Sequence, residues 1–97
     1  MEIICKVLEI GALEQRTFTD RNGQNQQINE RTIKMKNRGN LIVGKMVGNT
    51  AVNFVAPAQF FETDLWACNM EVVSREYNGQ NGTTYFTDVR INYLEKL

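Results

Sequence analysis

The chain has 97 residues, of which 42% are hydrophobic and 23% charged, and its 11 basic residues balance its 11 acidic ones. This length suits one domain with a single hydrophobic core, and the composition is that of a globular rather than a disordered protein. No segment approaches the roughly 20 consecutive apolar residues of a membrane helix, and the first residues do not resemble a secretory signal peptide. We therefore expect a cytoplasmic protein with no membrane partner.

The first third of the chain predicts three strands. Residues 2 to 10 are almost continuously apolar, and residues 13 to 19 form a second candidate strand before the turn signal Asn22-Gly23. Residues 26 to 36 predict a third strand with an alternating end. Ile33 and Met35 fall on one face, which we expect to face the core, while the lysines at positions 34 and 36 fall on the other.

The middle of the chain predicts two short strands and one helix. Residues 41 to 47 and 51 to 55 have strand-like composition and are separated by Gly48-Asn49. Pro57 is well placed to begin a helix over residues 57 to 66, because proline is tolerated in the first helical turn. Phe60, Phe61 and Leu65 would then share a buried stripe.

The last third predicts a long β-hairpin. Apolar runs at residues 70 to 73 and 85 to 94 flank a turn region with Asn78-Gly79 and Asn81-Gly82, and Asn-Gly readily supplies the positive φ of a tight turn. Tyr85 and Phe86 must point to opposite faces of a strand. Val89, Ile91 and Tyr93 share the face of Tyr85, so we expect that row to point inward and Phe86 to point outward.

This order of elements predicts an all-β fold. Many short strands joined by glycine-containing turns are typical of a sandwich or barrel. One short helix between strands 3 and 4 narrows the prediction to a five-stranded OB-fold Greek-key barrel that ends in a long C-terminal hairpin. We expect residues 1–97 to form a single OB-fold domain.

The sequence offers little chemistry for catalysis. Histidine is absent and the acidic residues are scattered singly, so we expect no enzyme activity, no cofactor, no metal and no small-molecule substrate. Cys5 and Cys68 lie in apolar runs and are expected to be buried, reduced thiols, with a disulfide as the less favoured alternative. The segment from Gly39 to Met46 approaches a phosphate-binding loop, but Met46 stands where a hydroxyl must reach magnesium, so we interpret it as a strand.

The segment from Glu71 to Val89 resembles the last two strands of bacterial single-stranded DNA-binding proteins. It contains an apolar strand, Arg75, an aromatic residue two positions later at Tyr77, a glycine-containing tip, and an aromatic residue followed by Thr-Asp-Val. The resemblance implies an OB-fold that binds single strands, often as an oligomer, with Arg75 and Tyr77 at the nucleic acid. The acidic tip of the housekeeping members of this family is absent before Leu97. The sequence therefore resembles a compact relative of these proteins.

Two hypotheses on function follow. In the first, the protein binds single-stranded DNA without catalysis or strong sequence preference, in replication, recombination or a mobile element, with RNA left open as a partner. Backbone charge and base stacking would come from eight residues, and the protein would be a homo-oligomer, either a dimer or a tetramer. The predicted contacts are Arg16, Phe18, Arg31, Lys34, Lys36, Arg75, Tyr77 and Phe86.

In the alternative, the OB-fold is an oligomeric protein-interaction module that does not bind nucleic acid. The zero net charge favours this reading, because a domain that holds phosphates is usually basic overall. The rings of the hairpin would then be cross-strand pairs that only stabilise the sheet.

Overall fold

The computed structural model describes residues 1–97 and contains six strands and one short helix. No helix in it is long and apolar enough to cross a membrane. The elements in chain order are β1 (Glu2–Ile10), β2 (Glu14–Thr19), β3 (Asn25–Asn37), β4 (Asn40–Val47), α1 (Asn49–Asn53), β5 (Trp66–Gly79) and β6 (Gly82–Lys96).

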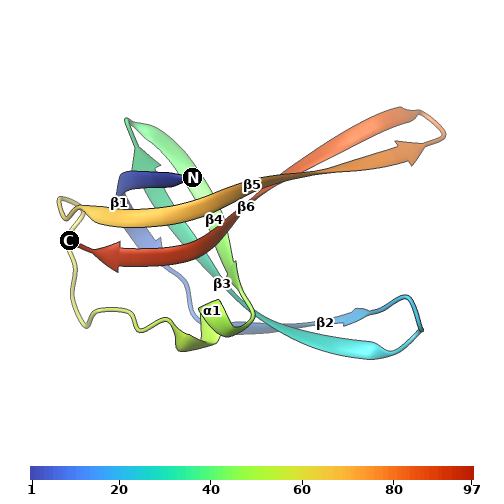
Figure 1. The fold of residues 1–97 in the computed structure, drawn as a ribbon, viewed down its shortest axis with the longest axis horizontal. Helices are drawn as coiled ribbons and strands as arrows, with labels where there is room; N and C mark the ends of the chain where they lie inside the picture. The colour runs from blue at the N-terminus through green and yellow to red at the C-terminus, as the bar shows by residue number, and fades with distance from the viewer.

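Five of the strands pair into a closed ring. The ring runs from β1 to β5, β6, β4 and β3, and it closes because β3 pairs with β1 again. β2 pairs only with β3, outside the ring (Figure 1). Every pairing is antiparallel except that of β4 with β6, which is parallel and consists of Lys45 opposite Arg90. At this crossing a Cβ on Gly44 would lie 2.9 Å from Cδ1 of Ile91 and 3.2 Å from Cγ1 of Val89, so a larger residue would force these two side chains of β6 to move.

The hydrophobic core fills the inside of the ring. Ile33 and Met35 are fully buried, whereas Lys34 and Lys36 are exposed, so the predicted alternation of this strand is confirmed. Met35, Met46, Met70 and Trp66 fill much of the interior, which suits an irregular space between curved strands. The buried apolar residues are Cys5, Val7, Ile33, Met35, Met46, Ala51, Trp66, Cys68, Met70, Ile91 and Leu94.

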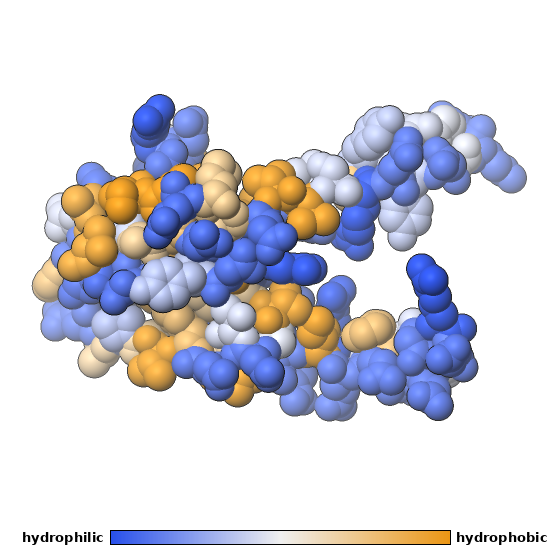
Figure 2. Space-filling model, in the orientation of Figure 1, coloured by the Kyte–Doolittle hydropathy of each residue, from blue (hydrophilic) through white to orange (hydrophobic).

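Two hairpins extend from the ring as arms (Figure 1). The first consists of β2 and the beginning of β3, and the second consists of the distal halves of β5 and β6. They project to the same side of the ring and give the molecule its longest dimension of 46 Å. The space-filling view shows an open gap between two mostly hydrophilic arms (Figure 2).

The turns of the arms follow the glycine signals of the sequence. In the first arm, Gly23 has a φ of 77°, and the Asp20 carboxylate accepts hydrogen bonds from the backbone N–H groups of Asn22 and Gln24. The bond from Gln24 is the main reason that the pKa of Asp20 lies below its ordinary value, followed by the side-chain bond from Gln26. In the second arm, Gly82 has a φ of 112°. Both tips are therefore defined turns.

The prediction of a mostly β chain with one short helix is confirmed, but the position predicted for the helix is wrong. The helix α1 spans Asn49–Asn53, where a strand over 51 to 55 was expected, and residues 57 to 65 contain neither helix nor strand. α1 packs against β3 and β4, with Ala51 fully buried. Trp66 begins β5 opposite Cys5, and the Phe60 ring meets the Trp66 ring edge to face at 5.6 Å. Trp66 is thus buried as part of the sheet and not as part of the predicted helix.

The expected inward row on the last strand is also only partly right. Ile91 is buried and Val89 is partly buried, but Tyr93 is 46% exposed. The pairing of β5 with β6 shifts between Asn69 and Met70, which leaves Asn92 as an extra residue and turns Leu94 inward in place of Tyr93. Tyr85 lies on the free arm, where no core covers it.

Candidate nucleic-acid interface

The outer surface of the ring gathers positive charge because of the register between its strands. Lys6 on β1 lies opposite Lys36 on β3, and Lys36 in turn lies opposite Leu41 on β4. At the crossing of β4 and β6, Lys45 lies opposite Arg90. Like charges directly opposite each other on neighbouring strands destabilise a sheet. The pairing of Lys6 with Lys36 is therefore a feature that sheet stability does not explain, whereas Arg90 also lies opposite Glu71 on β5.

The same face continues along β6 onto the second arm. Because side chains alternate, Phe86 and Asp88 share the face of Arg90, and Phe86 lies opposite Arg75. The ring of Tyr77 meets that of Phe86 edge to face, with centroids 5.6 Å apart and planes at 88°. These two rings, with Arg75 and Thr84, line an open hollow of about 430 Å³. The arm thus presents two exposed rings beside a guanidinium group.

The first arm joins this face at its base. Arg16 and Phe18 lie opposite Ile28 and Gln26, the outward positions of β3, so they do not lie directly across from Lys34 and Lys36. Arg16 and Lys45 both approach the carboxylate of Glu30, with N–O distances of 3.7 and 3.5 Å. Glu30 is buried, and these two cations hold it from both sides. The shared carboxylate places Arg16 and Lys45 side by side.

We call this surface the cationic face. It contains seven basic residues, and Phe18, Tyr77 and Phe86 lie on the same side of the sheet. The seven residues are Lys6, Arg16, Lys34, Lys36, Lys45, Arg75 and Arg90.

Carboxylates of the protein itself pair with four of these cations. Besides Glu30, Glu9 lies 3.3 Å from Lys34, and Asp88 accepts a 2.9 Å hydrogen bond from Arg75. These last two pairs are exposed to solvent, where such ion pairs contribute at most about 1 kcal/mol. Lys6, Lys36 and Arg90 have no carboxylate within 4.0 Å. The face therefore combines four cations that are internally neutralised with three that form no ion pair, of which only Arg90 has a carboxylate, Glu71, directly opposite it on the next strand.

Of the eight predicted contacts, Arg31 lies apart from the others. Its guanidinium donates a 3.0 Å hydrogen bond to the carbonyl oxygen of Gly11 and lies 5.6 Å from the ring centre of Phe54. Arg31 shares the face of Ile33, not that of Lys34. Its contacts join β3 to the segment after β1 and to the end of α1, which is a structural role.

No protein-family model and no curated protein matches this chain. The interpretation of the cationic face therefore rests on its geometry and its charges.

Three cations of the face were missed at the sequence level. Lys45 lies in the segment first compared with a phosphate-binding loop, and it points outward because its neighbours Gly44 and Met46 face the core. Lys6 and Arg90 were each an isolated charge in an apolar strand. The signal that identifies all three is their pairing across strands, which depends on the register.

The two cysteines lie in the core and take no part in this face. Both are free and buried, as expected. A hydrogen bond from the thiol of Cys68 lowers the pKa of Cys5, and the same bond together with burial raises the pKa of Cys68. Cys68 thus stays a neutral thiol at physiological pH.

Proposed function

We propose that this protein is an OB-fold that binds single-stranded nucleic acid and performs no catalysis. The ligand that we propose is single-stranded DNA. The fold assignment is supported by the strand order of the ring. β1, β3 and β4 form a meander, and the β5–β6 hairpin closes between β4 and β1. This arrangement agrees with the five-stranded Greek-key barrel of OB-folds, in which two strands and their flanking loops bind oligonucleotides. β3 and β4, with the two arms, occupy the corresponding positions.

The observation that carries the proposal is the like-charge pairing of Lys6 with Lys36 on the cationic face. Lys6 and Lys36 repel each other in the free protein, and an anion between them removes that repulsion, whereas Lys45 and Arg90 are offset by Glu30 and by Glu71, which lies opposite Arg90 on β5. A nucleic-acid backbone supplies regularly spaced anions. The proposed path of the backbone runs over these residues from β1 across β3 and β4 to β6.

The rings of the second arm favour a single strand over a duplex. Tyr77 is 61% exposed and Phe86 is 50% exposed, so both offer surface to a ligand. An unpaired base can stack on such a ring, and each stacked base contributes about 1 to 3 kcal/mol without strong sequence preference. In a duplex the bases are already stacked on one another, and only its phosphates would be recognised.

The zero net charge of the chain is compatible with this proposal because the cations are concentrated on one surface. Four of them are partly neutralised by Glu9, Glu30 and Asp88, so we expect modest affinity that falls steeply with salt. The biological setting that we propose is replication, recombination or a mobile element, where single strands are exposed.

A titration of fluorescent oligo-dT of about 30 nucleotides tests this function. Fluorescence anisotropy at low and moderate salt, with a duplex of equal length as control, should show saturable binding to the single strand that weakens with salt. An oligo-U of the same length measures the preference between DNA and RNA. Equal affinity for the duplex, or no binding at low salt, would refute the proposal.

A second property, self-association, is favoured by apolar side chains on the outer face. Ile4, Leu41 and Val43 are 52%, 61% and 47% exposed, and the Asn37 side chain donates a 2.9 Å hydrogen bond to the carbonyl oxygen of Ile4 beside them. A second copy would cover this patch in a dimer or tetramer, and it would compete there with nucleic acid, because Leu41 and Val43 lie opposite Lys36 and Lys34. Light scattering should then give a mass above that of the monomer. Leu41→Ser should shift the measured mass toward that of the monomer. An oligomer that does not bind oligo-dT would support the protein-interaction module instead.

A further inference from the structure

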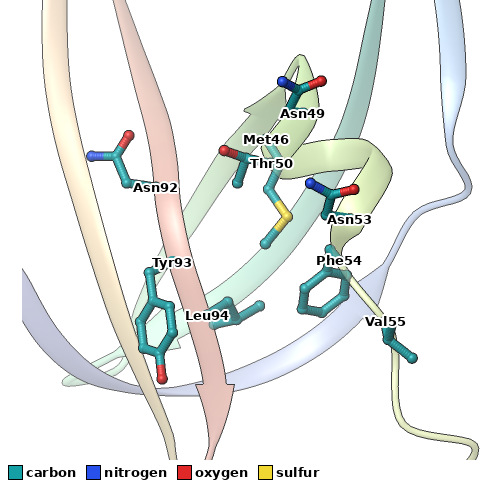
Figure 3. A pocket seen from close by; sticks show the side chains of 9 residues that line it. All are labelled: Met46, Asn49, Thr50, Asn53, Phe54, Val55, Asn92, Tyr93 and Leu94. Atoms are coloured by element: carbon teal, nitrogen blue, oxygen red, sulfur yellow. The ribbon is translucent and has the colours of Figure 1, made fainter.

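A groove opens between β6 and α1 (Figure 3), and none of the residues that line it belongs to the cationic face. It has a volume of about 480 Å³. The side chains of Met46, Phe54 and Leu94 point into it and form an apolar floor, while Thr50 and Asn53 of α1 stand at its rim (Figure 3). We call it the β6 groove.

The β6 groove exists because β6 loses its neighbour on one side. β4 and β6 pair only at Lys45 and Arg90, and β4 ends two residues later at Val47. α1 fills part of the gap but packs against β3 and β4, not against β6. From Asn92 onward, β6 therefore has only β5 as a strand partner.

The backbone of β6 is consequently available in the groove. Asn92, Tyr93 and Leu94 are consecutive and all line it, so the edge of the strand itself forms one wall. The bulge leaves Asn92 without a partner on β5, and beyond it alternate residues of an antiparallel pair direct their N–H and C=O groups away from the partner strand. No backbone hydrogen bond outside the ladders satisfies these groups on the α1 side. The edge can accept another strand.

The absence of charged residues in the groove distinguishes its ligand from that of the cationic face. None of the nine residues that line the groove is charged, although 22 of the 97 residues in the chain are. A phosphate would lose its hydration there without gaining a cation. An uncharged segment with apolar side chains matches both the floor and the rim.

We propose that the β6 groove binds an extended, uncharged peptide segment of a partner protein. The segment adds to β6 as a strand between β6 and α1 and forms main-chain hydrogen bonds with residues Asn92 to Leu94. Its apolar side chains, at alternate positions, rest on Met46, Phe54 and Leu94. This site goes beyond nucleic-acid binding, and it leaves the cationic face free to hold a strand at the same time.

The experiment uses the full chain, labelled with ¹⁵N, and a pool of peptides of about six residues in which Val, Ile, Leu or Phe alternates with Thr. Titration should shift the backbone amide signals of Asn92 to Leu94 and of Thr50 to Phe54, with the other signals unchanged. Two N-methylated versions of each binding peptide serve as controls. Methylation of the alternate residues that face β6 should abolish binding, and methylation of the other set should be tolerated.

A pair of variants locates the site. Asn53→Arg places a long charged side chain at the rim and should weaken peptide binding by about ten-fold or more. Gln59→Arg adds the same charge to an exposed position outside the groove and should leave binding unchanged. No amide shift at about 1 mM peptide, equal tolerance of both methylated sets, or no effect of Asn53→Arg would each overturn the proposal. Oligo-dT should not displace the peptide, and displacement would assign the groove to nucleic acid instead.

Discussion

Replacing Asp88 with asparagine should strengthen binding to single-stranded DNA. In the free protein, Asp88 accepts a 2.9 Å hydrogen bond from Arg75, and the two side chains are 58% and 60% exposed. Asparagine keeps the shape but removes the charge, so Arg75 becomes available to a phosphate beside Tyr77 and Phe86. The exposed ion pair contributes at most about 1 kcal/mol to folding, so the fold should be retained.

The magnitude follows from the number of free cations. Each phosphate contact on a single strand contributes about 0.7 to the slope of log K against log salt concentration. The three cations that form no ion pair, Lys6, Lys36 and Arg90, give a slope of about −2, or a loss of roughly 15-fold in affinity between 50 and 200 mM salt. Asp88→Asn adds one contact and steepens the slope by about 0.7. At about 0.1 M salt this corresponds to about 1 kcal/mol, or roughly five-fold tighter binding.

The assay is an anisotropy titration of labelled oligo-dT at several salt concentrations for the wild type, Asp88→Asn and Glu62→Gln. Glu62 is exposed in the segment before β5 and has no ion-pair partner, so its variant removes the same charge away from the cationic face. Only Asp88→Asn should change the slope. Equal gains in both variants would show that only net charge matters, and weaker binding of Asp88→Asn would refute the role given to Arg75.

Three further predictions concern the arm, the ring closure and the core. Tyr77→Ala should weaken oligo-dT binding by roughly 5- to 100-fold, whereas Tyr85→Ala, on the opposite face of the arm, should not; equal losses in an anisotropy titration would contradict the stacking role. Gly44→Ala would place a Cβ 2.9 Å from Ile91 and should lower the free energy of unfolding in urea by about 1 to 3 kcal/mol; an unchanged midpoint would contradict the tight crossing. The raised pKa and burial of Cys68 should make the native protein react with iodoacetamide far more slowly than the protein in guanidinium at about pH 8.5, as followed by mass spectrometry; equal rates would contradict the buried thiol.

The strands of this protein were predictable because their signals are local. The alternation from Ile33 to Lys36 identifies which side of β3 faces the core, and the glycines at 23 and 82 adopt the positive φ that their Asn-Gly pairs indicate. The charged positions of β3 and the rings of the last hairpin were found in the same way. These features depend only on residues close together in the chain.

The helix was not predictable from local signals. Gly48, with a φ of 68°, starts one helical turn that places Ala51 in the core, although the residues around it have the composition of a strand. Trp66 belongs by composition to the predicted helix after Pro57, but it pairs with β1 and begins β5. In both segments, packing against distant strands decides the conformation.

The full extent of the cationic face was hidden for a related reason. Each cation on β1, β4 and β6 looks ordinary by itself, and only the register places Lys6 beside Lys36 and Lys45 beside Arg90. Arg31 shows the converse, because a cation close to Lys34 in sequence lies on the other side of the strand and contacts Gly11. Composition finds the cations, but pairing decides which of them lie together.

The measurement that tests the central claim most directly is an amide spectrum of the ¹⁵N-labelled protein titrated with unlabelled oligo-dT. The signals that shift should map to the outward positions of β3, β4 and β6 and to the second arm, with Lys36, Lys45, Arg90 and Tyr77 among them. The amides of α1, from Thr50 to Asn53, should not move. Shifts confined to other surfaces, or a spectrum unchanged by saturating oligo-dT at low salt, would contradict the assignment of the cationic face as a nucleic-acid interface.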